Sequence, residues 1–210
     1  MANRSTRRMA ALIGTAVASF VVALTGIDAQ AEEQRVTVCI ESGVALQESI
    51  MAQAIAGKMF ADIGIKIDWH KESKCPTEQE GVIHISLNTG VDANLYPGAL
   101  AIALPYEGVR IQVFVDRVRI LVIPRIVPTL LAHALAHEIT HILQGVSRHS
   151  ETGVMKARWN QKDYEDMAYK PLPFAKDDIR LLHYGLLARA AGRAQINQIA
   201  ADSAPAFPAQ

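Results

Sequence analysis

The sequence predicts an α+β domain, in which a twisted, mostly β sheet carries one early helix and a later helix beneath it, followed by a small C-terminal helical part. Three observations support this fold class. Short segments that alternate polar and apolar residues dominate the first half of the chain, as half-buried strands do. A long apolar run with helical spacing follows, and another helical segment lies near the C-terminus. The 210 residues, without a repeat or a long linker, fit a single domain.

Strands and helices are placed by their hydrophobic period and by the residues that end them. Five strands are expected, at 35–40, 65–70, 81–87, 99–104 and 109–115. Four helices are expected, at 44–60, 116–123, 128–144 and 177–199. The third of these helices has Pro128 in its first turn and Gly145 after its end, which are favoured start and stop residues.

The first 31 residues are typical of a signal peptide. A basic start with three arginines precedes residues 9–27, which carry no charge. Ala29-Gln30-Ala31 then fits the small-x-small pattern before a cleavage site. The run is also about long enough for an uncleaved membrane anchor, but Gly, Ser and Thr interrupt it. We therefore expect an exported protein, periplasmic or secreted, whose mature chain begins at Glu32 and has no further contact with the membrane.

Composition excludes one class of partner. Lys and Arg number 21, as do Asp and Glu, so the formal net charge is zero. A nucleic-acid-binding domain needs a basic face, and a base-stacking platform needs more aromatic residues than the 6% present. We expect no nucleic-acid partner.

Two cysteines, Cys39 and Cys75, lie in the mature part of the chain. In an oxidising compartment they can form one disulfide, which would stabilise the fold by closing a long loop. The alternative is two unpaired thiols, one of them buried in a strand.

The chemistry of the chain centres on His137-Glu138-Ile139-Thr140-His141. Residues four apart on a helix share one face, so both imidazoles can reach one metal ion, while Glu138 can reach a water beside it. This HExxH pattern is that of zinc hydrolases, where the metal lowers the pKa of the water and the glutamate accepts its proton. The surrounding helix is strongly apolar, and such a helix buries polar side chains only for a reason.

A third protein ligand is needed for catalytic zinc. His149 is the first candidate, because Gly145 lets the chain turn back after the helix. Glu165 is an alternative, as in zinc enzymes that use a downstream helical glutamate. His133 lies one turn before His137, but three successive turns splay too far for one tetrahedral ion, so a supporting place in the cleft is expected for it.

The stretch from His137 to Trp159 resembles the active site of metzincins, in which an HExxH helix turns at a glycine, a third histidine follows and a methionine turn underlies the metal. The resemblance implies Zn²⁺ bound by His137, His141 and His149, Glu138 as the general base, and a methionine turn at Met155. It implies one metzincin-like domain over 32–210, with the sheet and active helix in 32–145 and a C-terminal subdomain in 146–210.

The chain is most similar to a group of uncharacterised exported bacterial proteins with the longer motif HExxH-x3-G-x3-H, and this likeness covers roughly residues 109–182. The usual metzincin pattern places the glycine three residues after the second histidine and the third ligand six after it. Here the glycine comes after four residues and His149 after eight, while Ser147 occupies the usual ligand position.

These features predict a zinc-dependent peptidase, most simply an endopeptidase, whose peptide or protein substrate lies along an edge strand. The sequence does not identify this edge strand, and the strand at 99–104 is one candidate. Two alternatives stay open: a zinc-binding but non-catalytic periplasmic protein of the same fold, and a metal-free helix with a chance motif.

Overall fold

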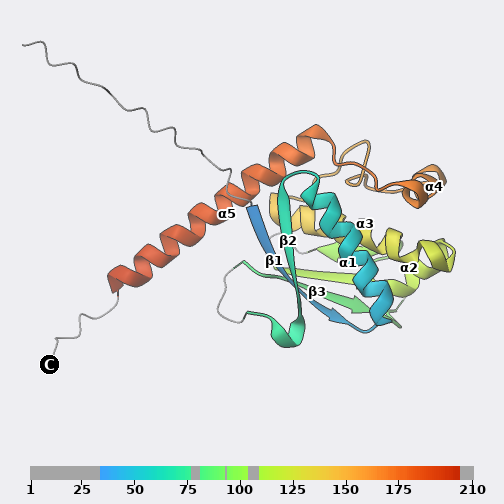
Figure 1. Cartoon of the computed structure of the whole chain (residues 1–210), viewed down its shortest axis with the longest axis horizontal. Coiled ribbons are helices and arrows are strands. Elements are labelled where there is room, and N and C mark those ends of the chain that lie inside the picture. The colour runs from blue at the N-terminus through green and yellow to red at the C-terminus, as the bar shows by residue number, and fades with distance from the viewer. Residues whose placement is uncertain (1–33, 77–80, 93, 104–108, 204–210) are drawn as a thin grey trace, which may run out of the picture. The chain divides into compact units, whose positions relative to one another are not determined.

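The computed structural model describes residues 34–76, 81–92, 94–103 and 109–203. Residues 1–31, where the signal peptide is predicted, lie outside this range, and that prediction and the division into domain parts stay predictions. Figure 1 shows the elements in chain order, which are β1 (Gln34–Ser42), α1 (Leu46–Ala61), β2 (Ile65–Lys71), η1 (Glu72–Lys74), β3 (Ile83–Asn88), β4 (Ala101–Ala103), β5 (Arg110–Phe114), α2 (Val115–Leu121), η2 (Pro124–Ile126), α3 (Val127–Gln144), α4 (Gln161–Tyr169) and α5 (Lys176–Ser203).

The five described strands form one mixed sheet in the order β2-β1-β3-β5-β4. The first four run parallel to their neighbours, and only β4 runs antiparallel, with Ala101 opposite Val113 of β5. Among the described strands, β4 therefore lies at one edge, and it corresponds to the candidate strand at 99–104. The predicted α+β class with a twisted sheet is confirmed.

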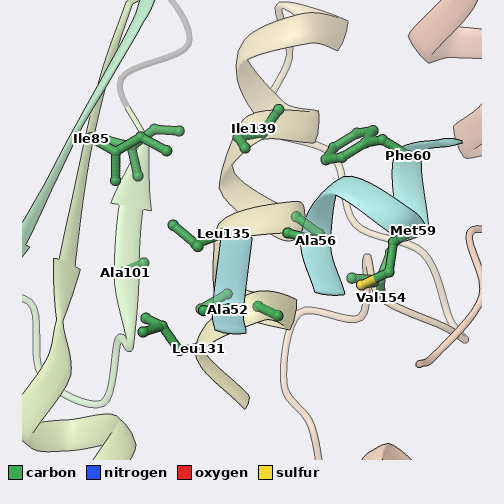
Figure 2. Close-up of a cluster of buried hydrophobic side chains, with 14 of the residues drawn as sticks. Ala52, Ala56, Met59, Phe60, Ile85, Ala101, Leu131, Leu135, Ile139 and Val154 are labelled. Atoms are coloured by element: carbon green, nitrogen blue, oxygen red, sulfur yellow. The ribbon is translucent and has the colours of Figure 1, made fainter. Parts of the chain in front are cut away.

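The strands follow the alternation read from the sequence. In β3 the residues Ile83, Ile85 and Leu87 are buried and the residues between them are half-buried. The buried side chains pack with α1 and α3. In Figure 2, Ile85 and Ala101 of the sheet point toward Leu131 and Leu135 of α3. Such burial removes apolar surface from water, which stabilises the fold by about 1.5–3 kcal/mol for each large side chain.

Small residues let α1 pack closely on α3. Ala52 and Ala56 are fully buried on the face of α1 that meets α3, and Met59 and Phe60 fill the space beyond them. Gly185 likewise lets α5 pack closely on α3, because a Cβ at this position would lie 1.9 Å from the carbonyl oxygen of Leu143. The helix that carries the HExxH motif is thus held from two sides.

All residues of α3 except Thr129 and Gln144 are buried. The segment Pro124–Gln144 is long and apolar enough to cross a membrane, yet 89% of its apolar window is buried inside the protein. It is the core helix of this domain. The helix ends at Gly145, which adopts the left-handed conformation (φ 67°) and donates its N–H to the carbonyl of His141, as the glycine signal predicts.

The predicted disulfide is present between Cys39 of β1 and Cys75 after η1. One element was not foreseen: α4 follows the loop after residue 146, and Asn160 caps it through a reciprocal bond with Asp163. Only Met167 of α4 is buried, so its apolar period is too weak to indicate a helix.

Candidate metal centre

Two imidazoles of α3 face each other. His137 and His141 lie one helical turn apart, their ring centroids are 4.7 Å apart, and their Nε2 atoms are 3.0 Å apart. Both residues are almost fully buried. The i, i+4 spacing of the sequence thus becomes a pair of nitrogen atoms directed at one point, as expected for a helix.

The loop after α3 brings a third imidazole to the pair. The ring centroid of His149 lies 5.3 Å from that of His137 and 4.9 Å from that of His141. One nitrogen from each of the three rings lies within 4.8 Å of the others. The connection of eight residues after His141, longer than in the usual metzincin pattern, therefore still returns His149 to the helix.

Backbone carbonyls set the tautomers of the two helical histidines. Nδ1 of His137 lies 2.9 Å from the carbonyl oxygen of Val154, and Nδ1 of His141 lies 3.1 Å from that of Val146. A carbonyl only accepts hydrogen bonds, so in the neutral rings both Nδ1 atoms carry the proton. The two Nε2 atoms then face each other with lone pairs.

Facing lone pairs at this distance repel unless a cation or a proton lies between them. The pKa of His137 is lowered from 6.5 to about 4, chiefly by burial and in part by the neighbouring histidines, although its bond to the Val154 carbonyl opposes this shift. Burial also lowers the pKa of His141 and of His149. The site thus disfavours a proton at neutral pH. Neutral imidazoles whose second nitrogen bonds a carbonyl are typical zinc ligands, so these residues fit a zinc ion.

Glu138 lies beside the three histidines and points into the same cleft. Its side chain is almost fully buried, and burial raises its pKa from 4.5 to about 7, although a backbone hydrogen bond from Ala103 of β4 lowers it. A carboxyl group with a pKa near the working pH is suited to accept and return a proton. The bond to Ala103 also ties this carboxylate to the edge strand.

A cleft of about 640 Å³ opens above these groups. One part of its lining is the segment 97–103, which ends in β4, and another is the segment 156–159 together with Tyr164. The floor holds His137, Glu138 and His141. A cleft of this size accommodates several residues of an extended chain or a small ligand.

The loop that carries His149 is held from below by one buried carboxylate. Oδ1 of Asp178, at the start of α5, accepts from Arg148 and from the Ser150 hydroxyl, both at 2.7 Å. The backbone N–H of Ser150 donates to the carbonyl of Met155 over 2.8 Å. Met155 itself is fully buried, and its role as a methionine turn beneath the metal stays a prediction.

The rival third ligands lie elsewhere. Glu165 is exposed on α4, where it accepts a bond from Gln161, and it does not belong to the histidine group. His133 is fully buried, with Nδ1 2.7 Å from the carbonyl of Thr129 and Nε2 accepting from the N–H of Leu172. Both of its nitrogens are engaged, so it joins α3 to the segment before α5. Ser147 lines the cleft.

The sequence did not single out Asp178, Lys156 or Arg158. In the sequence, Asp178 is one of two adjacent acids at the start of a predicted helix, which is ordinary for a helix dipole. Its burial is the signal that distinguishes it, and burial is a property of the fold. Nothing in the sequence distinguishes Lys156 and Arg158 from the other basic residues of the chain.

No known protein family matches the sequence, and no curated protein does. Among solved structures, the chain is similar to archaemetzincin from Methanopyrus kandleri, with a TM-score of 0.52 and 14% sequence identity, over 73% of this chain and 96% of that chain. The chain has an archaemetzincin-like fold. This agrees, at the level of fold, with the metzincin resemblance read from the motif. The resemblance to exported bacterial proteins stays a prediction.

Proposed function

We propose that this protein is an exported zinc peptidase, with zinc bound by His137, His141 and His149 and with Glu138 as the general base. The observation that carries the proposal is the meeting of three neutral imidazoles and a buried carboxyl group at the floor of one cleft. The likeness of the fold to that of archaemetzincin supports the proposal at the level of fold.

A zinc ion held there supplies the Lewis acid that lowers the pKa of a water and polarises a peptide carbonyl. Glu138 is placed to take the proton of that water and then to give it to the amide nitrogen that leaves. The low polarity that raises the pKa of Glu138 also strengthens its interaction with the reacting groups. The carbonyls of Val146 and Val154 hold the two helical imidazoles in the tautomer that leaves Nε2 free for the metal.

The edge strand is suited to hold the substrate. Among the described strands, β4 pairs only with β5, so its outer edge has no strand partner. That edge belongs to a wall of the cleft. An extended peptide can add to such an edge through main-chain hydrogen bonds, which places its backbone over Glu138 and the histidines. This geometry favours cleavage within a chain.

Export is the second part of the proposal, and two features support it. The first 31 residues have the pattern of a cleaved signal peptide. The disulfide between Cys39 and Cys75 forms readily in an oxidising compartment and rarely in the cytosol.

The first test is the metal content of residues 32–210, purified in the wild-type form and as His149→Ala and His84→Ala. His84 is the matched control, since it binds Glu72 and lies outside the histidine group. We expect about one zinc per chain in the wild type and in His84→Ala, and a marked loss in His149→Ala. Wild-type protein without zinc would overturn the proposal.

The second test separates catalysis from metal binding. Glu138→Gln keeps the three histidines and is expected to keep zinc, while cleavage of a mixed peptide library falls by about 100- to 10,000-fold. Zinc bound without any cleavage in the wild type would favour the alternative, a non-catalytic zinc-binding protein with this fold.

A further inference from the structure

The described residues that line the cleft carry an uneven set of charges. Glu138 is the only acidic residue among them, and two basic residues, Lys156 and Arg158, belong to the lining segment 156–159. The three histidines add the charge of any metal that they hold. A substrate that enters this cleft therefore meets two basic side chains.

The charge of Lys156 is already compensated. Its ammonium lies 2.5 Å from the carboxylate of Asp163, and both side chains are largely buried. Asp163 also receives the backbone N–H of Asn160 over 2.7 Å. The pair fixes the segment before α4 and leaves no net charge for a ligand.

The charge of Arg158 is not compensated in the same way. Its side chain is exposed and lines the cleft. Among the described parts of the chain, no carboxylate lies within ion-pair distance of its guanidinium, and no hydrogen bond joins it to another residue. An exposed guanidinium in a cleft is a ready partner for a carboxylate, which it binds through two parallel N–H groups.

The neighbours of Arg158 hold its backbone beside the metal site. Trp159 places its ring edge against His137, with the ring centroids 5.7 Å apart. On the other side, Lys156 is held by Asp163 and by a bridge to Ser150. Arg158 thus lies between two anchored residues, one residue from a ring that contacts a proposed zinc ligand.

We propose that Arg158 is a specificity-determining residue that binds a carboxylate of the peptide substrate. The substrate class is a peptide with an acidic group close to the bond that is cleaved. The proposal rests on the proposed peptidase function, because it names what the same cleft prefers. The carboxylate comes from a Glu or Asp side chain or from the C-terminus of the peptide, and the chemistry of recognition is the same in both cases.

The test measures binding in the zinc-loaded Glu138→Gln protein, so that hydrolysis does not interfere. The probes are alanine-rich octapeptides with an amidated C-terminus, in which one Glu or one Gln occupies each position in turn. A second set has Gln only and a free C-terminus. The protein is compared with the same protein carrying Arg158→Ala, Arg158→Glu or Arg180→Ala. Arg180 is the matched control, being an exposed arginine of α5 that pairs with Asp177 outside the cleft.

For one or two adjacent positions we expect Glu peptides to bind about tenfold more tightly than Gln peptides, as one charge-assisted pair implies. Arg158→Ala should bring this ratio close to one, and Arg158→Glu should reverse it in favour of the Gln peptides. Arg180→Ala should leave it unchanged. If the free C-terminus alone gives the preference, the recognised carboxylate is the terminal one, and the proposal holds in that form.

Two outcomes would overturn the proposal: equal binding of all the peptides to the parent protein, or a Glu preference that persists in Arg158→Ala. Both are distinct from failure of the peptidase itself. A protein that prefers Glu through Arg158 but hydrolyses nothing keeps this binding site and loses only its proposed catalysis. A protein that hydrolyses neutral and acidic peptides equally keeps its catalysis and loses this site.

Discussion

The hydroxyl of Ser150 donates a hydrogen bond to Oδ1 of Asp178 over 2.7 Å, and so joins the residue after His149 to the start of α5. Arg148, on the other side of His149, donates to the same oxygen over 2.7 Å. Asp178 is fully buried, and its second oxygen accepts the N–H of Ala175 over 3.2 Å. A buried carboxylate is stable only with such partners. One acidic side chain thus fixes both neighbours of the third histidine.

Replacing Asp178 should therefore weaken zinc binding without touching a zinc ligand. In Asp178→Asn the charge-assisted bonds to Arg148 and Ser150 are lost, and we expect the zinc affinity to fall by about 10- to 100-fold. The free energy of unfolding should fall by about 1.5–3 kcal/mol. Chelator competition measures the first quantity and denaturant unfolding the second.

Asp177→Asn is the matched control for this prediction. Asp177 is adjacent to Asp178, but its side chain is 63% exposed and, among the residues that the structure describes, pairs only with Arg180 of the same helix. Both variants remove one negative charge from the first turn of α5. Equal zinc affinity in the two variants would show that the loop holds His149 without Asp178.

The buried His133 should make the metal-free protein sensitive to mild acid. Burial lowers its pKa from 6.5 to about 4, although the bond to the Thr129 carbonyl opposes this. Between these two values the unfolded chain binds a proton that the folded chain excludes, so stability is complete above pH 6.5 and falls as the pH decreases. The loss from this residue is about 2 kcal/mol at pH 5.

His133→Gln tests this prediction, because an amide can donate to Thr129 and accept from the N–H of Leu172 as the imidazole does. Denaturant unfolding of the metal-free wild type and variant is compared at pH 7.5 and pH 5. The acid-induced loss should be smaller in the variant by about 2 kcal/mol. The same loss in both proteins would assign the acid sensitivity to other groups.

The disulfide should stabilise the fold by lowering the conformational entropy of the unfolded chain. It joins residues 36 apart in sequence, and closing a loop of this length corresponds to about 3–4 kcal/mol in the chain-entropy description. Dithiothreitol should lower the unfolding temperature of the wild type. The double variant Cys39→Ala, Cys75→Ala is expected to unfold at the lower temperature with or without the reductant, and a reductant effect of equal size in it would contradict this account.

Local periodicity predicted most of the fold. The strands at 35–40 and 65–70 and the helix at 128–144 fall within the observed elements or within two residues of them, because alternation and helical spacing are properties of neighbouring residues. The order of the sheet depends on pairing between distant segments, and no local pattern specifies it. The short α4 escaped prediction for a local reason, since it buries one side chain and its clearest signal is the cap formed by Asn160 and Asp163.

The candidate site divides in the same way. The pairing of His137 with His141 follows from their spacing on a helix. The position of His149 beside these two residues depends on the path of the loop after Gly145. The spacing did not specify that path, and the structure shows that it brings His149 to His137 and His141. The role of Asp178 depends on its burial, and the role of Arg158 depends on the absence of an ion-pair partner among the described residues. Neither property can be read from the sequence, where Asp178 does not differ from the adjacent Asp177.

Arg117 should hold the wall of the cleft that contains β4. Its guanidinium donates to the carbonyls of the segment before β4, at 2.7 Å to Tyr96, 2.8 Å to Ala99, 3.0 Å to Asp92 and 2.5 Å to Leu95. It also lies 4.3 Å over the ring of Phe114. A lysine ammonium is a compact charge with three donors and has no planar face, so it cannot replace this arrangement.

In Arg117→Lys we therefore expect the segment 92–99 to open more often, with faster limited proteolysis there and a loss of about 1–3 kcal/mol in the free energy of unfolding. Peptide binding to the cleft should weaken while the zinc content stays at the wild-type value, because no zinc ligand lies on this wall. Arg119→Lys is the control, since this neighbour on α2 pairs with Glu48 and not with the segment. If zinc content falls together with peptide binding, Arg117 supports the metal site as well as the segment before β4, and this prediction is wrong.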